Sequence, residues 1–478
     1  MKNKILARIQ KDFENCPDLI IKEIKLNKKE IIYVTYLETV TGSDKVNDYI
    51  LKNLSAISGK TRKNLNDIQS LLPSPNTVDI QELDKIEFYI TNGFTIVIHK
   101  EEIYAVETKA DINRGIPEPT SEPTIVGPKD GFTENIQINL GLVKRRIKSH
   151  TLKTDTVVLG RKTTTMINIL YIDDIAEKES VQKIKKELEK IDIDGLVDSG
   201  TIAEYLELEN DTHFPSVLRT ERPDSVANGL VEGKIAILVD TSPFALILPA
   251  FFFDFINPIS DNYLKSKNVN FLKILRLSCF FFTMMIPGFY IAIINYNPET
   301  IPTSLLINFG TQRADVPFPA IVEALIMLII CEILKESDVR FPNSYGSAIS
   351  ILGALVLGEA AVSAGIVSPI MIIVIAFTFI TSLLFTNQEV VSATRHFRFI
   401  FLFTASLYGL FGIFLALIYF FIHVTELTSL DKPYFYPIAP YDKIYLKKGI
   451  LKARVDKEIR RSDMLTKKNK IRQRRNES

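Results

Sequence analysis

The chain has 478 residues, of which 46% are hydrophobic and 24% are charged, and its net charge is only +1. A charge so close to zero predicts no nucleic-acid partner, and the three scattered cysteines lack metal-ligand spacing, which indicates reduced thiols in a cytoplasmic or intramembrane setting. The N-terminus has no apolar core, so no cleavable signal peptide is expected.

Residues 1–106 are expected to form a first α/β lobe. A charged, helix-like segment opens this lobe, and a further helix-like segment at 79–91 ends before Asn92-Gly93, which is a strong turn signal. Strand-like segments are expected at 31–40, 94–100 and 102–108. A packed sheet without chemistry is the expected structure.

Residues 107–155 are expected to be a linker followed by a basic helix. The linker, 107–130, is rich in Pro, Glu, Thr and Gly. After it, apolar residues recur at helical spacing over 136–147, beside a basic run at 144–148. Such a helix can bind phosphates, lie on an anionic membrane surface, or be solvated or ion-paired within the molecule, and the sequence leaves these alternatives open.

Residues 156–240 are expected to form a second α/β lobe, in which strands alternating with helices predict a βαβ layout. No Gly-rich phosphate-binding loop of known spacing occurs in it. The charged residues Glu221, Arg222 and Asp224 form a dense run that we interpret as a surface or domain-interface network rather than a catalytic site.

Residues 241–424 are expected to form an α-helical, multi-pass membrane domain, and residues 425–478 a basic cytoplasmic tail. An even number of crossings would keep both ends of the chain on the same side. In this topology Arg395 and Arg398 would lie on the opposite side, against the positive-inside rule. Four spans are predicted, at 275–294, 346–364, 366–386 and 397–422.

Two further apolar segments are ambiguous. Segment 244–256 is short, aromatic and interrupted by proline, so an interfacial or re-entrant position is expected. Segment 318–335 carries Glu323 and Glu332, and is expected to lie along the interface, to re-enter, or to be buried within an assembly. A fifth span together with membrane insertion of 244–256 would also give an even number of crossings.

Polar residues within the apolar segments are the candidate functional residues. Glu359, Val362 and Ser363 share one helix face, and a ring of such helices would place a carboxylate in a water-filled lumen that favours cations. The alternative is that Glu359 bonds a neighbouring helix without any ion path. Glu323 and Glu332 are nine residues apart and point to opposite sides of a helix. Glu336 and Arg340 follow them as further coupling candidates.

No enzymatic pattern is visible in the sequence. None of the five histidines pairs with a cysteine or a carboxylate at metal-ligand spacing, and no Ser/His/Asp pattern occurs. We therefore expect a protein that is not an enzyme and that needs no cofactor or metal.

Several runs of sequence, in a fixed order over residues 80–445, carry a resemblance to a known family. They include GPKDGFTENIQINLGLVKRRIKSHTL, IDGLVDSGTIAEYL, FPSVLRTERPDSVANGLVEGK, VPFPAIVEALIMLIICEILKESDVRFPNSYGS, GEAAVSAGIVSPI and KPYFYPIAPYD. With these runs the chain resembles the A subunit of GerA-type spore germination receptors of Gram-positive endospore formers. Glu359 departs from the small or neutral residue expected at that position.

The resemblance implies a two-lobed cytoplasmic domain on a membrane domain, located in the spore inner membrane with both ends on the spore core side. It implies a transporter-like B subunit and a lipoprotein C subunit as partners. The A subunit is expected to form a homo-oligomer among membrane lipids, which acts as a nutrient-gated channel for monovalent cations. The alternatives are a scaffold subunit that does not conduct and a secondary transporter that binds the nutrient itself.

Overall fold

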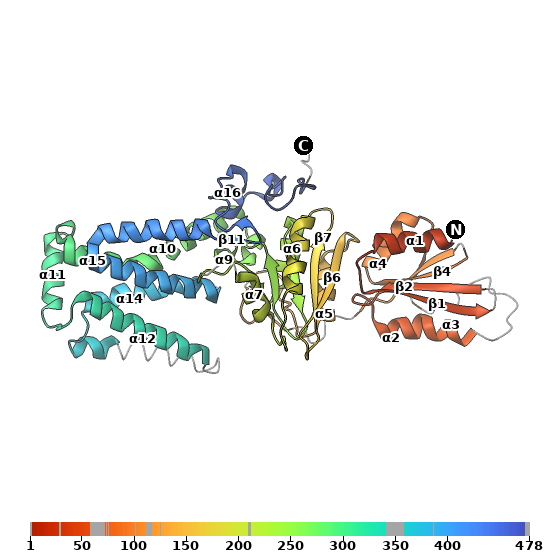
Figure 1. Ribbon diagram of the computed structural model, residues 1–478, viewed down its shortest axis with the longest axis horizontal. Coiled ribbons are helices and arrows are strands. Elements are labelled where there is room, and N and C mark those ends of the chain that lie inside the picture. The colour runs from red at the N-terminus through yellow and green to blue at the C-terminus, as the bar shows by residue number, and fades with distance from the viewer. Residues whose placement is uncertain are drawn as a thin grey trace.

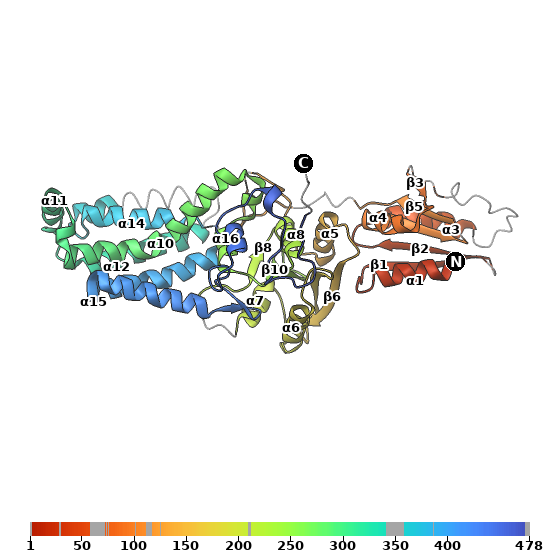
Figure 2. The same cartoon turned by 90° about the horizontal axis from the view of Figure 1, so that it is seen from above.

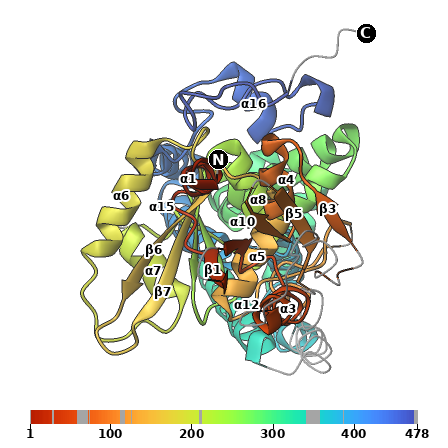
Figure 3. The same cartoon turned by 90° about the vertical axis from the view of Figure 1, so that its right-hand side faces the viewer.

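The computed structural model describes residues 2–27, 30–57, 72, 74, 76–100, 102–110, 117–124, 126–208, 212–340, 358–385 and 387–473. The molecule is elongated, and its three parts follow one another along the long axis: the first lobe, the second lobe and a bundle of long helices (Figure 1). The segment after the bundle returns to the second lobe, and a view along the long axis shows it on one side of the molecule (Figure 3).

The first lobe is an antiparallel five-stranded sheet in the order β1-β2-β4-β5-β3. The strands predicted at 94–100 and 102–108 are present as β4 and β5, which pair as a hairpin. Strand β1 was missed because its alternating Lys and Glu residues resemble the charged helix before it. The elements of this lobe are α1 (Lys2–Asp12), β1 (Leu19–Asn27), β2 (Glu30–Leu37), α2 (Ser43–Val46), η1 (Asn47–Leu51), α3 (Lys52–Ile57), β3 (Thr77–Asp79), η3 (Leu83–Lys85), α4 (Ile86–Thr91), β4 (Phe94–His99) and β5 (Glu102–Glu107).

The second lobe contains another five-stranded sheet, in the order β6-β7-β9-β10-β8. All its strand pairs are antiparallel, so the predicted βαβ layout is wrong. Its elements are α5 (Ile136–Arg146), β6 (Leu152–Leu159), β7 (Thr165–Ile172), α6 (Lys178–Glu189), α7 (Ser199–Glu207), β8 (Leu218–Thr220), α8 (Pro223–Glu232), β9 (Ile235–Val239) and β10 (Ala245–Leu248).

Segment 244–256, which was expected at the membrane interface, belongs to the second lobe. Strand β10 pairs with β8 and β9 and is buried along its whole length, and the short helix α9 (Phe252–Ile256) packs between this sheet and the bundle. A strand covered on both faces is apolar without interruption, so its composition cannot be distinguished from that of an interfacial segment.

The bundle consists of long helices that run along the axis and of α11, which closes the far end (Figures 1 and 2). Within the described residues, two helices, α10 and α15, are long and apolar enough to cross a membrane. The chain enters the bundle through η4 (Ile259–Tyr263). The bundle elements are α10 (Ser266–Tyr296), η5 (Pro298–Thr300), α11 (Thr303–Arg313), α12 (Ala320–Arg340), α14 (Pro369–Ser382) and α15 (Gln388–Glu426).

Helix α15 is not a single rod but a hairpin that reverses at Gly409. The glycine has φ 61° and ψ −141° within an otherwise helical segment. The rings of Phe397 and Phe420 lie 5.2 Å apart, whereas 23 residues of straight helix would separate them by about 35 Å. The predicted single span at 397–422 is therefore replaced by two antiparallel helices. Arg395 and Arg398 consequently lie toward the lobe-side end of the bundle rather than beyond it.

Helix α12 lies within the bundle, parallel to α14. Glu323 bonds Ser368 near the start of both helices, and Lys335 bonds Ser382 near their ends. Of the three alternatives for 318–335, these contacts agree best with burial among other helices. Helix α14 has 14 residues, about 21 Å, which is shorter than the predicted span at 366–386 and shorter than a hydrocarbon core of about 30 Å. Most of the predicted span at 346–364 lies outside the described residues.

The segment after the bundle contains β11 (Thr428–Ser429), β12 (Lys432–Pro433), α16 (Lys443–Gly449) and η6 (Val455–Lys457). It contacts the second lobe and the start of the bundle: Arg461 donates a hydrogen bond to the Val231 carbonyl, and Asn257 donates one to the Gly449 carbonyl. The C-terminal segment and the soluble lobes therefore meet at the same end of the bundle.

Candidate functional site

The centre of the charged run in the second lobe, Arg222, forms a buried clamp. Its side chain is 1% exposed and donates to both oxygens of Asp224, at 3.1 and 2.8 Å. The guanidinium also donates to Thr124 Oγ1 at 3.0 Å and to the Pro128 carbonyl at 2.9 Å. Helix α8 positions these groups, because Pro223 begins it and Gly233, in a left-handed conformation, ends it. The clamp thus fixes the linker onto the second lobe.

The clamp also reaches the entrance to the bundle. The Tyr263 hydroxyl donates to Asp224 Oδ2 at 2.5 Å, and its ring covers Gly127. Glu221 accepts hydrogen bonds from the backbone N–H groups of Thr120 and Ser121, at 2.7 and 3.2 Å. The three predicted domain-interface residues, Glu221, Arg222 and Asp224, are therefore brought together, whereas Tyr263 was missed because nothing in its local sequence indicates this contact.

Glu122, beside the clamp, is a carboxyl group whose pKa is shifted toward neutral pH. Burial raises its pKa to about 7, although a hydrogen bond from Thr220 Oγ1 at 2.6 Å opposes the shift. Because the folded pKa lies above that of the unfolded chain, the neutral carboxyl stabilises the fold fully below about pH 4.5, and this contribution is lost as the pH rises through about 7.

We expect Glu122→Gln to flatten the pH dependence of stability. In the wild type, the urea midpoint of unfolding should fall between about pH 5 and pH 8, and in the variant this fall should be smaller. Glu118→Gln, at an exposed carboxylate in the same linker, is the control and should behave as the wild type. Identical pH profiles for wild type and Glu122→Gln would show that the carboxyl is ionised in the fold.

The basic helix α5 joins the two lobes through ion pairs within the molecule. Lys144 is buried and bonds Asp18 of the first lobe, and Arg146 bonds both oxygens of Asp130 in the linker, at 2.5 and 2.6 Å. The Arg146 guanidinium lowers the pKa of Asp130 against the opposing effect of burial. Of the alternatives that the sequence left open for this helix, Lys144 and Arg146 fit ion pairing within the molecule.

Glu323 is fully buried at the far end of the bundle. It accepts hydrogen bonds from Ser368 N at 3.0 Å and Ser368 Oγ at 2.8 Å, and Arg313 lies 3.5 Å from its other oxygen. Its negative charge is therefore neutralised within the chain, and it ties α11, α12 and the start of α14 together.

Glu332 faces α15 in the interior of the bundle. Its oxygens lie 2.9 Å from Arg395 and 3.3 Å from Arg398, and Arg398, which is buried, also donates to the Thr283 carbonyl at 3.0 Å. Glu323 and Glu332 thus point to different neighbours, as their spacing predicts. In the sequence, Arg395 and Arg398 stood out only because the predicted topology placed them against the positive-inside rule, and nothing indicated that they pair with Glu332.

The remaining candidates are not brought into one site. Glu359 and Ser363 are exposed, Val362 is half-buried, and all three lie on the short helical stretch 358–363 beside the far end of the bundle. Glu336 is exposed near the end of α12, and the side chain of Arg340 lies outside the described part of the chain. Among the residues that the structure describes, no group of three or more His, Cys, Asp or Glu side chains could hold a metal ion.

The second lobe also contacts the α15 hairpin directly. Arg219 lies 3.3 Å from Glu389 at the start of the hairpin, and Thr212 bonds His423 at its end, at 2.8 Å. Phe214 packs against Phe397 and Phe420, one from each helix of the hairpin. A movement of this lobe would therefore reach both helices of the hairpin.

The sequence pattern of the family described as Bacillus/Clostridium GerA spore germination protein matches residues 7–464. Spore germination protein KA of Bacillus subtilis (strain 168) is 35% identical over 478 residues, which cover 98% of this chain and 88% of that protein. The uncharacterized membrane protein YfkQ of the same strain is 34% identical, with 92% of this chain and 86% of that protein covered. Spore germination protein GerLA of Bacillus cereus is 32% identical, with 91% and 90% covered.

The solved structure of the N-terminal domain of the A subunit of the Bacillus megaterium spore germinant receptor GerK3 is also similar to this chain. It shares 30% sequence identity, covers 52% of this chain and 94% of that chain, and has a TM-score of 0.41. The family pattern matches residues 7–464, and the relatives above are 32–35% identical over most of their length. The chain belongs to the GerA family of spore germination proteins.

Proposed function

We propose that the protein is the A subunit of a nutrient germinant receptor in the spore inner membrane, and that several copies form a nutrient-gated channel for monovalent cations. It acts without enzymatic chemistry and without a cofactor. A transporter-like B subunit would hold the nutrient, and a lipoprotein C subunit would complete the complex. The lobes and the C-terminal segment would lie on the spore core side. Family membership over almost the whole chain is the observation that carries this proposal.

The apolar outer surface of the bundle supports the membrane location. Large apolar side chains on α10, α14 and α15 are exposed along its length, including Phe271, Ile373, Ile380, Leu407 and Phe411. A soluble protein rarely leaves so much contiguous apolar surface in water, and lipid or further protein would cover it here. The multi-pass topology that we propose is supported by the opposite directions of α10 and α12 and by the reversal of α15 at Gly409.

The interior of a single bundle supports an assembly. At the lobe-side end of the bundle, Phe420 packs against Phe280 and Phe397 at centroid distances of 5.9 and 5.2 Å. Among the described residues, this close packing of rings opposes the passage of a hydrated ion through that end of a single bundle. Conduction would therefore run between copies, where the exposed Glu359 and Ser363 are available to face a shared lumen.

The contacts between the lobes and the hairpin support a gating mechanism. A nutrient that binds the closed and open receptor unequally would shift the population toward the open state. The movement would reach the bundle through Arg219 and Glu389 and through the packing of Phe214 against the hairpin. This route gives the soluble lobes a role in opening rather than in catalysis.

The channel is tested by replacing its candidate lumen residues. We expect Glu359→Ala, alone or with Val362→Ala and Ser363→Ala, to leave assembly intact and to change the rate of cation flux through reconstituted protein by about threefold or more, because a carboxylate ring raises the local cation concentration. Glu299→Ala, at an exposed carboxylate near the same end of the bundle, is the matched control.

The same variants are then measured in spores, as cation release after nutrient addition. Altered flux in vitro with altered release in spores supports a lumen at this helix. Unaltered flux and release would make Glu359 structural, and a complete absence of flux from well-folded oligomers would leave the chain as a scaffold for a conducting partner.

A further inference from the structure

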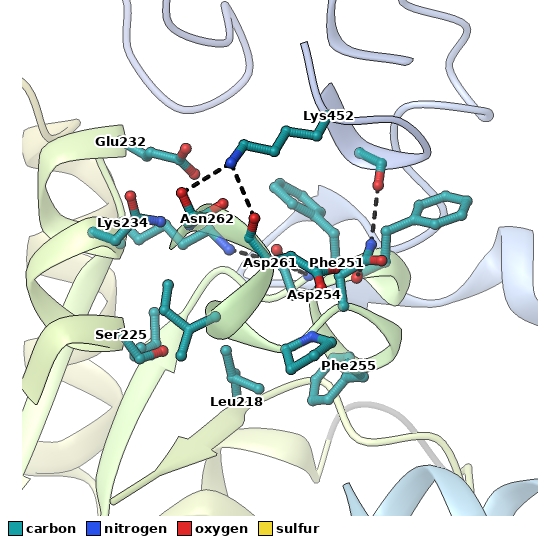
Figure 4. A pocket seen from close by; sticks show the side chains of 18 of the residues that line it. Leu218, Ser225, Glu232, Lys234, Phe251, Asp254, Phe255, Asp261, Asn262 and Lys452 are labelled. Atoms are coloured by element: carbon teal, nitrogen blue, oxygen red, sulfur yellow. Dashed lines mark hydrogen bonds and ion pairs between the residues drawn. The ribbon is translucent and has the colours of Figure 1, made fainter. Parts of the chain in front are cut away.

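A polar cavity of about 350 Å³ lies where the second lobe, the start of the bundle and the C-terminal segment meet (Figure 4). Its volume is within the range of small-molecule sites. The face of α8 that carries Ser225, Asn228 and Glu232 forms one wall, and Asp254 and Lys273 come from the opposite elements.

Most charges around the cavity are already neutralised. Lys234 bonds Asp254 at 2.6 Å, and Arg276 bonds both oxygens of Asp261 at 2.7 Å. Glu122, whose pKa is raised to about 7, is only partly charged at neutral pH. A further pair on the wall joins Arg472 to Glu232 and Glu458.

Two lysines on the wall differ from these pairs. Lys273 is 9% exposed, and in the described part of the chain it donates one long hydrogen bond, 3.4 Å, to the Gly449 carbonyl. Lys452 donates to the carbonyls of Asp261, Asn262 and Leu264 at 2.7–3.0 Å. Neither ammonium group has a carboxylate within ion-pair distance in the part of the chain that the structure describes. Burying a cation without an opposite charge is costly.

Uncharged hydrogen-bonding groups accompany these cations. Ser225 and Asn228 lie on the cavity side of α8, three residues apart, and within the described residues neither side chain has a hydrogen-bond partner. Figure 4 shows Ser225 and Leu218 on the side of the cavity opposite to Lys452 and Asn262. The lining carries equal numbers of acidic and basic side chains. What distinguishes the cavity is that two of its lysines have no carboxylate at ion-pair distance among the described residues and share the lining with the free side chains of Ser225 and Asn228.

The cavity lies beside the part of α10 at which the exposed apolar surface of the bundle begins. On α10, Phe271 is 68% exposed and Ile274 is 53% exposed, whereas Lys273 between them points inward and lines the cavity. If lipid covers the apolar outer face, Lys273 lies at the depth at which phosphate groups of lipid headgroups are found.

We propose that this cavity is a binding site for a phosphate group, carried either by a small soluble phosphate ester or by a membrane lipid. The ammonium groups of Lys273 and Lys452 have no carboxylate at ion-pair distance among the described residues and can pair with a phosphate group. Lys273 and Asn228 supply donors for its oxygens, and Lys452, which already donates to three carbonyls, adds positive charge. Because the cavity joins the second lobe to the start of α10, an occupant would stiffen this junction. The site does not depend on whether the chain conducts ions.

The test uses the purified full-length chain in phosphate-free detergent, with the thermal midpoint of unfolding as the readout. Glycerol phosphate at about a hundred times its Kd should raise the midpoint by about 3 °C, and sodium acetate at the same ionic strength should not. Nanodiscs in which phosphatidylglycerol replaces phosphatidylcholine test the lipid source.

Lys273→Met is the diagnostic variant. It removes a buried charge without a carboxylate partner at nearly constant volume, so the unliganded variant should unfold at the wild-type temperature or above it. Its response to phosphate should weaken at least about tenfold. Lys267→Met, at an exposed lysine on the same helix, is the control and should respond as the wild type.

A shift with glycerol phosphate that needs Lys273 supports a soluble ligand, and a shift only with phosphatidylglycerol that needs Lys273 supports a lipid headgroup. Equal shifts in wild type and Lys273→Met, an equal shift with acetate, or no shift with any of these probes would overturn the proposal.

Discussion

Replacing Arg222 with methionine should destabilise the second lobe by about 3–5 kcal/mol, because it leaves the Asp224 carboxylate buried without its cation. Arg222→Lys should recover only part of this loss, since a lysine cannot donate to Asp224, Thr124 and the Pro128 carbonyl at once. The measurement is the urea midpoint of the full chain in detergent. Tryptic cleavage after Lys129 should also become faster as the linker detaches.

Arg161→Met is the control for this prediction, because Arg161 pairs with Asp192 on the surface of the same lobe, and its loss should change the stability by less than about 1 kcal/mol. Equal midpoints for the two variants would show that the clamp contributes nothing. In spores, loss of the clamp should also weaken the nutrient response, since Tyr263 links Asp224 to the entrance of the bundle.

Gly409→Ala should prevent the α15 hairpin from closing. The backbone angles at this residue are accessible essentially only to glycine, and an added Cβ would lie 2.9 Å from the Tyr296 side chain. We expect a loss of at least about 3 kcal/mol, visible as a lower thermal midpoint and as heterogeneity in size-exclusion chromatography. Gly310→Ala, in the exposed helix α11 where nothing lies within 4 Å, should be neutral or slightly stabilising.

Cysteine labelling tests the hairpin itself. In the wild-type background, Asn387→Cys and Glu426→Cys mark the two ends of α15, and Tyr408→Cys marks its turn. An impermeant thiol reagent should reach both ends from the same side of the membrane and the turn from the other side. Labelling of Asn387→Cys and Glu426→Cys from opposite sides would establish a single crossing and contradict the hairpin.

The two lobes show where local sequence was sufficient. Asn92-Gly93 predicts the turn that leads from α4 into β4, and the strand-like runs at 94–100 and 102–108 predict β4 and β5, which pair with each other. These features are encoded within about fifteen neighbouring residues. The direction of the strands in the second lobe was not predictable in this way. Strand pairing depends on how segments far apart in sequence cross over, and alternation of helices with strands favours the parallel answer by default.

In the candidate site, too, local sequence predicted some features, and contacts between distant residues decided the others. The sequence identified Glu221, Arg222 and Asp224 as an interface network, since so dense a run of opposite charges needs mutual pairing. The burial of this network and its extension to Tyr263 depend on a segment about forty residues later. Likewise, the apolar helix 318–335 was recognised together with its two carboxylates, but their arginine partners come from other helices.

By itself, the sequence determined the order of the parts: two α/β lobes, an apolar helical region with embedded carboxylates, a basic tail, and membership of the GerA family. These features depend on composition, short-range periodicity and matching runs of residues. The tertiary structure alone decided that segment 244–256 is a buried strand and helix, that α15 folds back at Gly409, and that Glu323 and Glu332 are neutralised inside the chain. In each case the local pattern fits several environments equally well, and the choice among them is made by contacts between residues distant in sequence.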